Sequence, residues 1–156
     1  MILVTGGAFQ GKLEFAQKTY GFTDGWIDGR NCGFAEIREC RGIHHFHEYV
    51  RRMTGTGENA FLPDEENDAE TCAQVPWNFE NEDLTALENQ ADLFAAWLIK
   101  ENPKLVIVSN ELGYGVVPME KQDRLWREAA GRICTCLAAR ADEVVRVVCG
   151  IGMRLK

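Results

Sequence analysis

Near the N-terminus, glycines and one lysine stand at a spacing that could bind phosphate. Residues 6–12 read Gly-Gly-Ala-Phe-Gln-Gly-Lys and fit the first seven positions of the pattern G-x-x-x-x-G-K. In such a loop backbone N–H groups and a helix N-terminus face the anion, and the lysine reaches the outer phosphates. A plain glycine-rich turn between a strand and a helix is the alternative. The expected nucleotide contacts are Gly6, Gly7, Ala8, Phe9, Gln10, Gly11, Lys12 and Leu13.

The eighth position of this pattern departs from what phosphoryl transfer usually needs. Ser or Thr at that position supplies a hydroxyl ligand to Mg²⁺, but this chain has Leu13, whose alkyl side chain cannot bind a metal. Two interpretations follow. Either other carboxylates and water hold the metal together with the nucleotide phosphates, or the loop binds phosphate without efficient transfer.

The three histidines of the chain form a second group with possible chemistry. They are His44, His45 and His47. Apolar residues recur at three- and four-residue steps from Ile43 to Met53, which predicts an amphipathic helix. On that helix His44 and His47 would share one flank. A zinc site with Cys40 as a further ligand is one interpretation, and a surface or substrate-pocket histidine is the favoured one.

The elements that must position these residues alternate between strand and helix. The expected strands are 2–5, 26–28, 105–108 and 143–149, and the expected helices are 13–20, 43–53, 84–98 and 119–139. Residues 55–80 have no period, so we expect a long loop there and treat it as a possible lid. This alternation predicts one α/β domain over 1–156 with a mainly parallel central sheet.

Polar residues stand where such sheets place their ligands, at the carboxyl ends of strands. Asn110 and Glu111 follow the apolar run 105–108, and Asp28 ends a short strand. Arg124, Arg127 and Arg132 fall on the predicted helix 119–139 among acidic neighbours. By themselves these arginines indicate a solvated face with ion pairs.

Composition narrows the class of partner. The net charge of -7 and the pI near 5.0 disfavour nucleic acid, which needs a basic face, but leave small anions possible. We see no signal peptide and no apolar run of the roughly 20 residues that cross a bilayer, so we expect a cytoplasmic protein without a membrane partner. None of the six cysteines stands in a C-x-x-C pair, and we expect reduced, buried thiols.

Two blocks of the chain are similar to a known family. The first is residues 1–8 with Gly11-Lys12. The second comprises residues 106–111, 113–115, 117–118, Arg124, 127–128, 131–132, 137–138, 141–144 and 150–156. In these blocks the chain resembles the bifunctional adenosylcobinamide kinase and adenosylcobinamide-phosphate guanylyltransferase of cobalamin assembly. The resemblance implies a three-layer P-loop NTPase-like (RecA-like) sandwich, ATP or GTP, a corrinoid substrate and a homo-oligomer.

The resemblance also implies roles for single residues. Lys12 would act on the phosphates, while Asp28 or Glu111 would aid a metal or the acceptor hydroxyl, with Asp28 as the Mg²⁺ ligand. Asn110 would contact substrate or phosphate, and the three arginines would clamp phosphate or make a subunit contact.

The middle of the chain departs from the family. We find no counterpart there of the family's second strand, third strand or guanylylated histidine, so the kinase half of the activity is favoured over the guanylyltransferase half. The competing hypothesis is a shortened binding module that holds a nucleotide or corrinoid and catalyses little.

Overall fold

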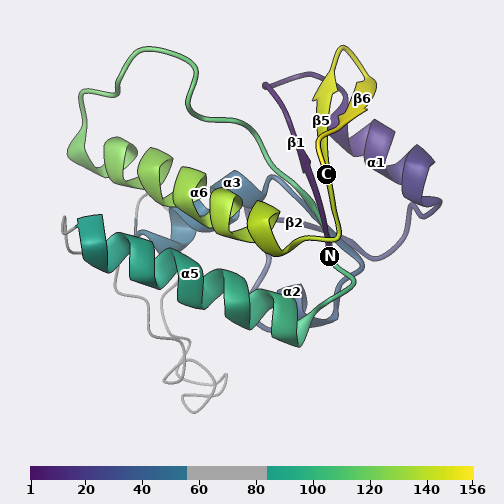
Figure 1. Ribbon diagram of the computed structural model, residues 1–156, viewed down its shortest axis with the longest axis horizontal. Coiled ribbons are helices and arrows are strands. Elements are labelled where there is room, and N and C mark those ends of the chain that lie inside the picture. Colours follow the sequence, from purple (N-terminus) through teal and green to yellow (C-terminus); the bar gives the residue numbers. More distant parts are fainter. Residues whose placement is uncertain (56–83) are drawn as a thin grey trace.

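A six-stranded sheet forms the centre of the computed structural model, which describes residues 1–55 and 84–156 (Figure 1). The strands lie in the order β2-β3-β4-β1-β5-β6. Pairing is parallel throughout except between β5 and β6, which are antiparallel. The strands are β1 (Ile2–Thr5), β2 (Trp26–Asp28), β3 (Gly42–His44), β4 (Val106–Val108), β5 (Glu143–Val148) and β6 (Ile151–Arg154).

Helices cover both faces of this sheet and complete three layers (Figure 1). On one face α1 packs against a valine cluster, and on the other α3, α5 and α6 cover the larger core. The helices are α1 (Lys12–Tyr20), α2 (Glu36–Glu39), α3 (Phe46–Met53), α5 (Leu84–Glu101) and α6 (Lys121–Arg140). None of the helices in the described ranges has both the length and the hydrophobicity to cross a bilayer.

The period-2 alternation of strand side chains explains the two cores. In β1, Leu3 belongs to the cluster under α5 and α6, whereas its neighbour Val4 belongs to the cluster under α1. Ile107 and Val108 divide in the same way. Because both faces are buried, the strands read as continuous apolar runs, and this confirms the predicted α/β sandwich with a mainly parallel sheet.

The predicted helix from Ile43 to Met53 is wrong at its start. Residues 42–44 form β3, which pairs with β2 and β4, and α3 begins only at Phe46. His45 separates the two with φ of 53°, a left-handed conformation that no helix continues through. Ile43 fitted the helical period but is buried in the sheet core. His44 and His47 therefore do not share a helix flank.

Other differences are smaller. The helix predicted over 119–139 begins at Lys121 and ends at Arg140, and α2 and β6 were not predicted. Of the free thiols, Cys32 is buried but Cys149 is exposed, contrary to the expected burial. The possible lid over 55–80 lies, after Gly55, outside the described residues.

Candidate functional site

The backbone between β1 and α1 requires glycine at two points. Gly6 has φ of +148°, and a Cβ at this position would lie 2.3 Å from the carbonyl oxygen of Val147. Gly11 has φ of +75° and caps the N-terminus of α1. The spacing of these glycines is thus set by one close approach to β5 and by one left-handed turn into the helix.

Residues that follow β4 and β5 hold this loop in place. The Gln10 carbonyl accepts from the Gly150 N–H at 2.9 Å, and the Gln10 Oε1 atom accepts from the Cys149 N–H at 2.6 Å. The Gly6 carbonyl accepts from the Glu111 N–H at 3.0 Å. Within residues 1–55 and 84–156 no hydrogen bond uses the N–H groups of residues 7–11, so these donors can serve an anion.

Lys12, the first residue of α1, folds its side chain back onto the preceding loop. Its side chain is buried, and its Nζ atom donates to the Gly7 carbonyl at 2.6 Å. Burial lowers the pKa of Lys12, and the charge of Glu111 opposes this shift. Leu13 is half-buried at the next position, while the side chain of Phe9 is fully exposed. The loop therefore holds a cation against its own carbonyl at the place where the motif expects outer phosphates.

Glu111 is held at the carboxyl end of β4 by a residue that the sequence analysis missed. Arg146 of β5 donates from Nε to Oε1 and from Nη2 to Oε2 of Glu111, both at 3.0 Å. The same guanidinium lies over the ring of Tyr114, 5.7 Å from its centroid. An arginine inside the apolar run 144–148 was the signal that could have pointed to this pair.

Asn110 contacts His47 of α3, one of the three histidines singled out from the sequence, although this contact was not predicted. The Asn110 N–H donates to His47 Nδ1 at 3.3 Å, and Asn110 Nδ2 lies 3.0 Å from His47 Nε2. The His47 carbonyl accepts from Trp126 Nε1 at 2.7 Å. Burial, together with the charges of His45 and Lys12, lowers the pKa of His47 to about 4. His47 is therefore neutral near pH 7 and supports the end of β4.

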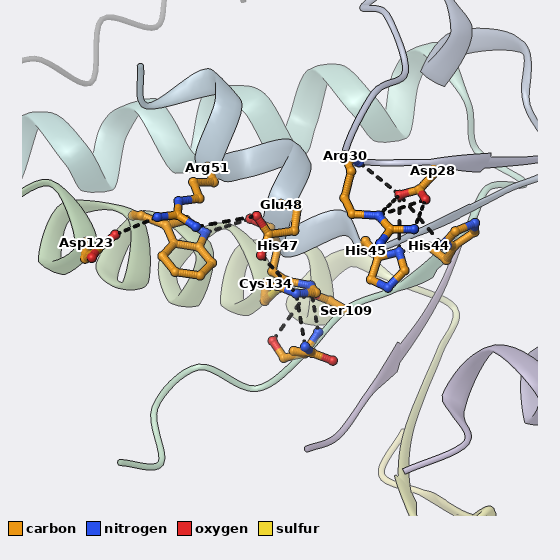
Figure 2. A network of polar contacts seen from close by, with 12 residues as sticks. Asp28, Arg30, His44, His45, His47, Glu48, Arg51, Ser109, Asp123 and Cys134 are labelled. Carbon is orange, nitrogen blue, oxygen red and sulfur yellow. Dashed lines mark hydrogen bonds and ion pairs between the residues drawn. The ribbon is translucent and has the colours of Figure 1, made fainter. Parts of the chain in front are cut away.

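Asp28 lies in a separate group at the ends of β2 and β3 (Figure 2). His45 Nδ1 lies 3.2 Å from Asp28 Oδ1, and His44 Nδ1 lies 2.7 Å from His45 Nδ1. Arg30 donates to both carboxylate oxygens of Asp28. Although burial opposes the shift, hydrogen bonds from Arg30 and the nearby histidines lower the pKa of Asp28 to about 2.

A cavity of about 1060 Å³ opens beside Glu111. Asn110, Arg124, Arg127 and Arg132 all line it. Arg127 donates to the carbonyls of Gly113 and Val116, and Arg124 donates to those of Pro118 and Met119, so both hold the segment 113–119. Arg132 forms ion pairs with Glu88 and Glu128, as expected for the solvated face.

The structure thus gathers most of the predicted site residues along one edge of the sheet. The loop 6–13, Asn110 and Glu111 follow β1 and β4, two adjacent strands. Asp28 is the last residue of β2, the strand at the sheet margin, yet both Lys12 and Asp28 act on the pKa of His47. The thiol of Cys40, proposed from the sequence as a zinc ligand, instead contacts the Ile37 carbonyl at 3.7 Å.

Comparison with known proteins decides the family. Residues 58–155, more than half of the chain, match the family model described as cobinamide kinase / cobinamide phosphate guanyltransferase. The chain belongs to this family. The P-loop NTPase-like fold of cobinamide kinases agrees with the sheet and loop described above. The matched residues include Asn110, Glu111 and the three arginines but not the loop 6–13, which rests on its own motif and geometry.

Curated relatives carry consistent names. The chain is 41% identical over 71 residues to the bifunctional adenosylcobalamin biosynthesis protein CobU of Salmonella typhimurium, covering 46% of this chain and 39% of that protein. It is 49% identical over 53 residues to CobU of Escherichia coli, covering 34% and 29%. It is 38% identical over 53 residues to CobP of Pseudomonas aeruginosa, covering 34% and 31%. The matched stretch spans less than two-fifths of each relative.

Proposed function

We propose that the chain transfers a phosphoryl group from ATP or GTP to the aminopropanol hydroxyl of adenosylcobinamide. The observation that carries this proposal is the loop after β1. It combines two glycines in conformations that only glycine adopts easily, backbone donors without partners in the described residues, and the buried cation of Lys12. Phosphoryl transfer depends mainly on positioning and on stabilising charge, which such a loop provides.

Residues around the loop have consistent roles in this proposal. Lys12 would leave the Gly7 carbonyl and bind the outer phosphates, since a phosphate oxygen is a stronger acceptor than a peptide carbonyl. The adjoining cavity would take the acceptor, because its volume of about 1060 Å³ suits a large ligand. Arg124 and Arg127 would shape its rim, and Arg132 or Asn110 would contact substrate or phosphate.

A divalent metal fits this loop only in part. Leu13 offers no hydroxyl, so Mg²⁺ would bind chiefly to the nucleotide phosphates and water. Both proposed carboxylates are paired with an arginine, Glu111 with Arg146 and Asp28 with Arg30. Glu111 is the favoured one, because it follows β4, the strand next to β1, and its charge acts on the pKa of Lys12. Mg²⁺ would offset phosphate charge, and Glu111 would orient the ion or the acceptor hydroxyl.

A binding module remains the second candidate function, and Leu13 is the observation that favours it. Such a module would hold a nucleotide or corrinoid in the same loop and cavity with little turnover. Guanylyl transfer is the weaker part of either proposal, since no histidine of this chain matches the guanylylated one by sequence. The homo-oligomer and the cytoplasmic location stay predictions.

One experiment separates the two candidates. The purified protein is incubated with Mg²⁺, adenosylcobinamide and ATP or GTP, and products are followed by mass spectrometry. The enzyme proposal expects adenosylcobinamide phosphate, lost in Lys12→Ala but kept in Lys18→Ala, an exposed lysine on the same helix. Nucleotide binding that depends on Lys12 without any product would overturn the enzyme and support the module.

A further inference from the structure

Three potential metal ligands converge at the carboxyl ends of β2 and β3, apart from the phosphate loop (Figure 2). They are Oδ1 of Asp28 and the Nδ1 atoms of His44 and His45. The separations are 2.7 Å between the two nitrogens, 3.2 Å from Asp28 to His45 and 3.9 Å from Asp28 to His44. The three atoms therefore form a small triangle of two imidazole nitrogens and one carboxylate oxygen.

The size of this triangle fits a first-row transition metal. A circle through three atoms at these separations has a radius of about 2 Å, close to the roughly 2.0–2.2 Å of Zn–N and Zn–O bonds. An ion near the centre of the triangle would reach all three atoms with little movement. When both imidazoles are neutral, only one proton fits between the two Nδ1 atoms, so one nitrogen donates and the other accepts. A metal ion between them would instead accept the lone pairs of both nitrogens.

Backbone geometry holds the cluster together. His45 sits at φ of 53°, a strained conformation for a residue other than glycine. Gly29 packs directly beneath it, because a Cβ there would lie 2.4 Å from the His45 carbonyl oxygen, and the Gly29 N–H donates to the His44 carbonyl at 2.8 Å. The loop after β2 thus fixes the turn that brings the two consecutive histidines to the same carboxylate.

We propose that Asp28, His44 and His45 bind a divalent transition metal of the Zn²⁺ type through three protein ligands, with solvent completing the coordination. Two imidazole ligands favour Zn²⁺ over Mg²⁺, which prefers oxygen. The His45 side chain is 39% exposed, which leaves an open side for the ion to enter and for water to bind. Cys40 is not part of this site, and Leu13 has no bearing on it.

Arg30 tunes this site. Its guanidinium contacts the carboxylate of Asp28, and the Arg30 side chain is 60% exposed. The arginine and a metal ion would therefore compete for the same carboxylate. Without the guanidinium, the Asp28 carboxylate would still accept a hydrogen bond from the backbone N–H of Arg30, which donates to Asp28 Oδ1 at 3.0 Å. The site therefore predicts an unusual result, namely that an arginine substitution strengthens metal binding.

The test is a Zn²⁺ titration of the chelator-stripped full chain against a chromophoric competitor. We expect the native chain to bind one Zn²⁺ ion. The Zn²⁺ affinity should fall by at least about tenfold in each of the variants Asp28→Asn, His44→Gln and His45→Asn. Asn is chosen at position 45 because it tolerates positive φ. Cys40→Ser is the matched control and should bind as the native chain does, while Arg30→Ala should bind more tightly.

A measurement without substitutions guards against variants that misfold. On adding Zn²⁺ to the native chain, the imidazole ¹⁵N signals of His44 and His45 should show the large shifts of direct coordination. Those of His47, which pairs with Asn110 and lies outside the cluster, should shift far less. Zinc binding that persists in the His44→Gln/His45→Asn double variant, or a native chain that binds no zinc, would overturn the proposal. Neither result bears on phosphoryl transfer, which is tested separately through Lys12.

Discussion

The ring of His47 faces two donors of one residue, the backbone N–H and the side-chain amide of Asn110, at 3.3 Å and 3.0 Å. A neutral imidazole has one acceptor nitrogen and can accept from one of these donors at a time. A protonated ring could accept from neither. His47 therefore supports the end of β4 only in its neutral form, which agrees with its burial and with its lowered pKa.

This arrangement predicts a loss of stability in mild acid. In the folded chain the pKa of His47 is lowered from its ordinary value of 6.5 to about 4, so between these pH values the unfolded chain binds a proton that the folded chain does not bind. The free energy of unfolding should decline as pH falls through this window, by up to about 3 kcal/mol. Urea unfolding of the native chain across the window measures it.

His47→Gln should flatten that decline, because glutamine does not titrate. Part of the slope should survive, since burial also lowers the pKa of His44 and so acts in the same direction. Asp28, with a pKa of about 2, acts only at lower pH. An unchanged slope in His47→Gln would contradict the role given to the neutral ring.

Gly6→Ala should disrupt the phosphate loop. The new methyl group would lie 2.3 Å from the Val147 carbonyl oxygen, and φ of +148° is a conformation that alanine avoids. We expect a loss of at least about 2 kcal/mol in the free energy of unfolding and of nucleotide binding. Gly131→Ala in α6, where a Cβ meets open space, is the control and should be neutral or gain about 0.5–1 kcal/mol.

Leu13→Ser tests how far the missing hydroxyl at the eighth position of the loop lowers Mg²⁺-dependent turnover. The serine hydroxyl would supply the missing metal ligand at the start of α1, so Mg²⁺-dependent turnover should rise if the native chain lacks that ligand. The rate of product formation is measured against Mg²⁺ concentration in both proteins. An active native chain whose rate does not change would mean that the metal is held elsewhere.

Arg127→Ala should loosen the segment 113–119 on the cavity rim. Arg127 donates to the carbonyls of Gly113 and Val116, so its loss would free this segment while the other residues that line the cavity stay in place. We expect corrinoid affinity to fall by about tenfold, roughly the loss of one charged hydrogen bond, while nucleotide affinity is unchanged. Calorimetric titration with each ligand measures both.

The control for that prediction lies on the same helix. Arg140 donates to Asp92 and to the Cys136 carbonyl, and although these two partners line the cavity, Arg140 itself is not among the lining residues and does not hold the segment 113–119. Arg140→Ala should therefore leave corrinoid affinity as it is. An equal loss in both variants would show that helix stability, and not the rim, controls binding.

Local sequence was sufficient to predict most elements and the glycine loop between β1 and α1. Strand 2–5 and helix 84–98 have periods that depend only on burial of one face or of both, and the glycine spacing of residues 6–11 follows from backbone conformation alone. The prediction of where α3 starts failed, because a buried apolar residue such as Ile43 fits the pattern of a strand as well as that of a helix. The boundary between β3 and α3 is set by His45, whose φ is 53°. No pattern in the sequence indicates this conformation at His45.

By itself, therefore, the sequence determined the α/β class, the loop and the carboxyl-end positions of Asn110 and Glu111, because these depend on neighbouring residues. Only the tertiary structure decided that Arg146 would hold Glu111, that His47 would face Asn110 and that His44 and His45 would meet Asp28. Each of these contacts joins segments from different parts of the chain. They meet only because parallel strands end at the same edge of one sheet, in an order that local patterns do not specify.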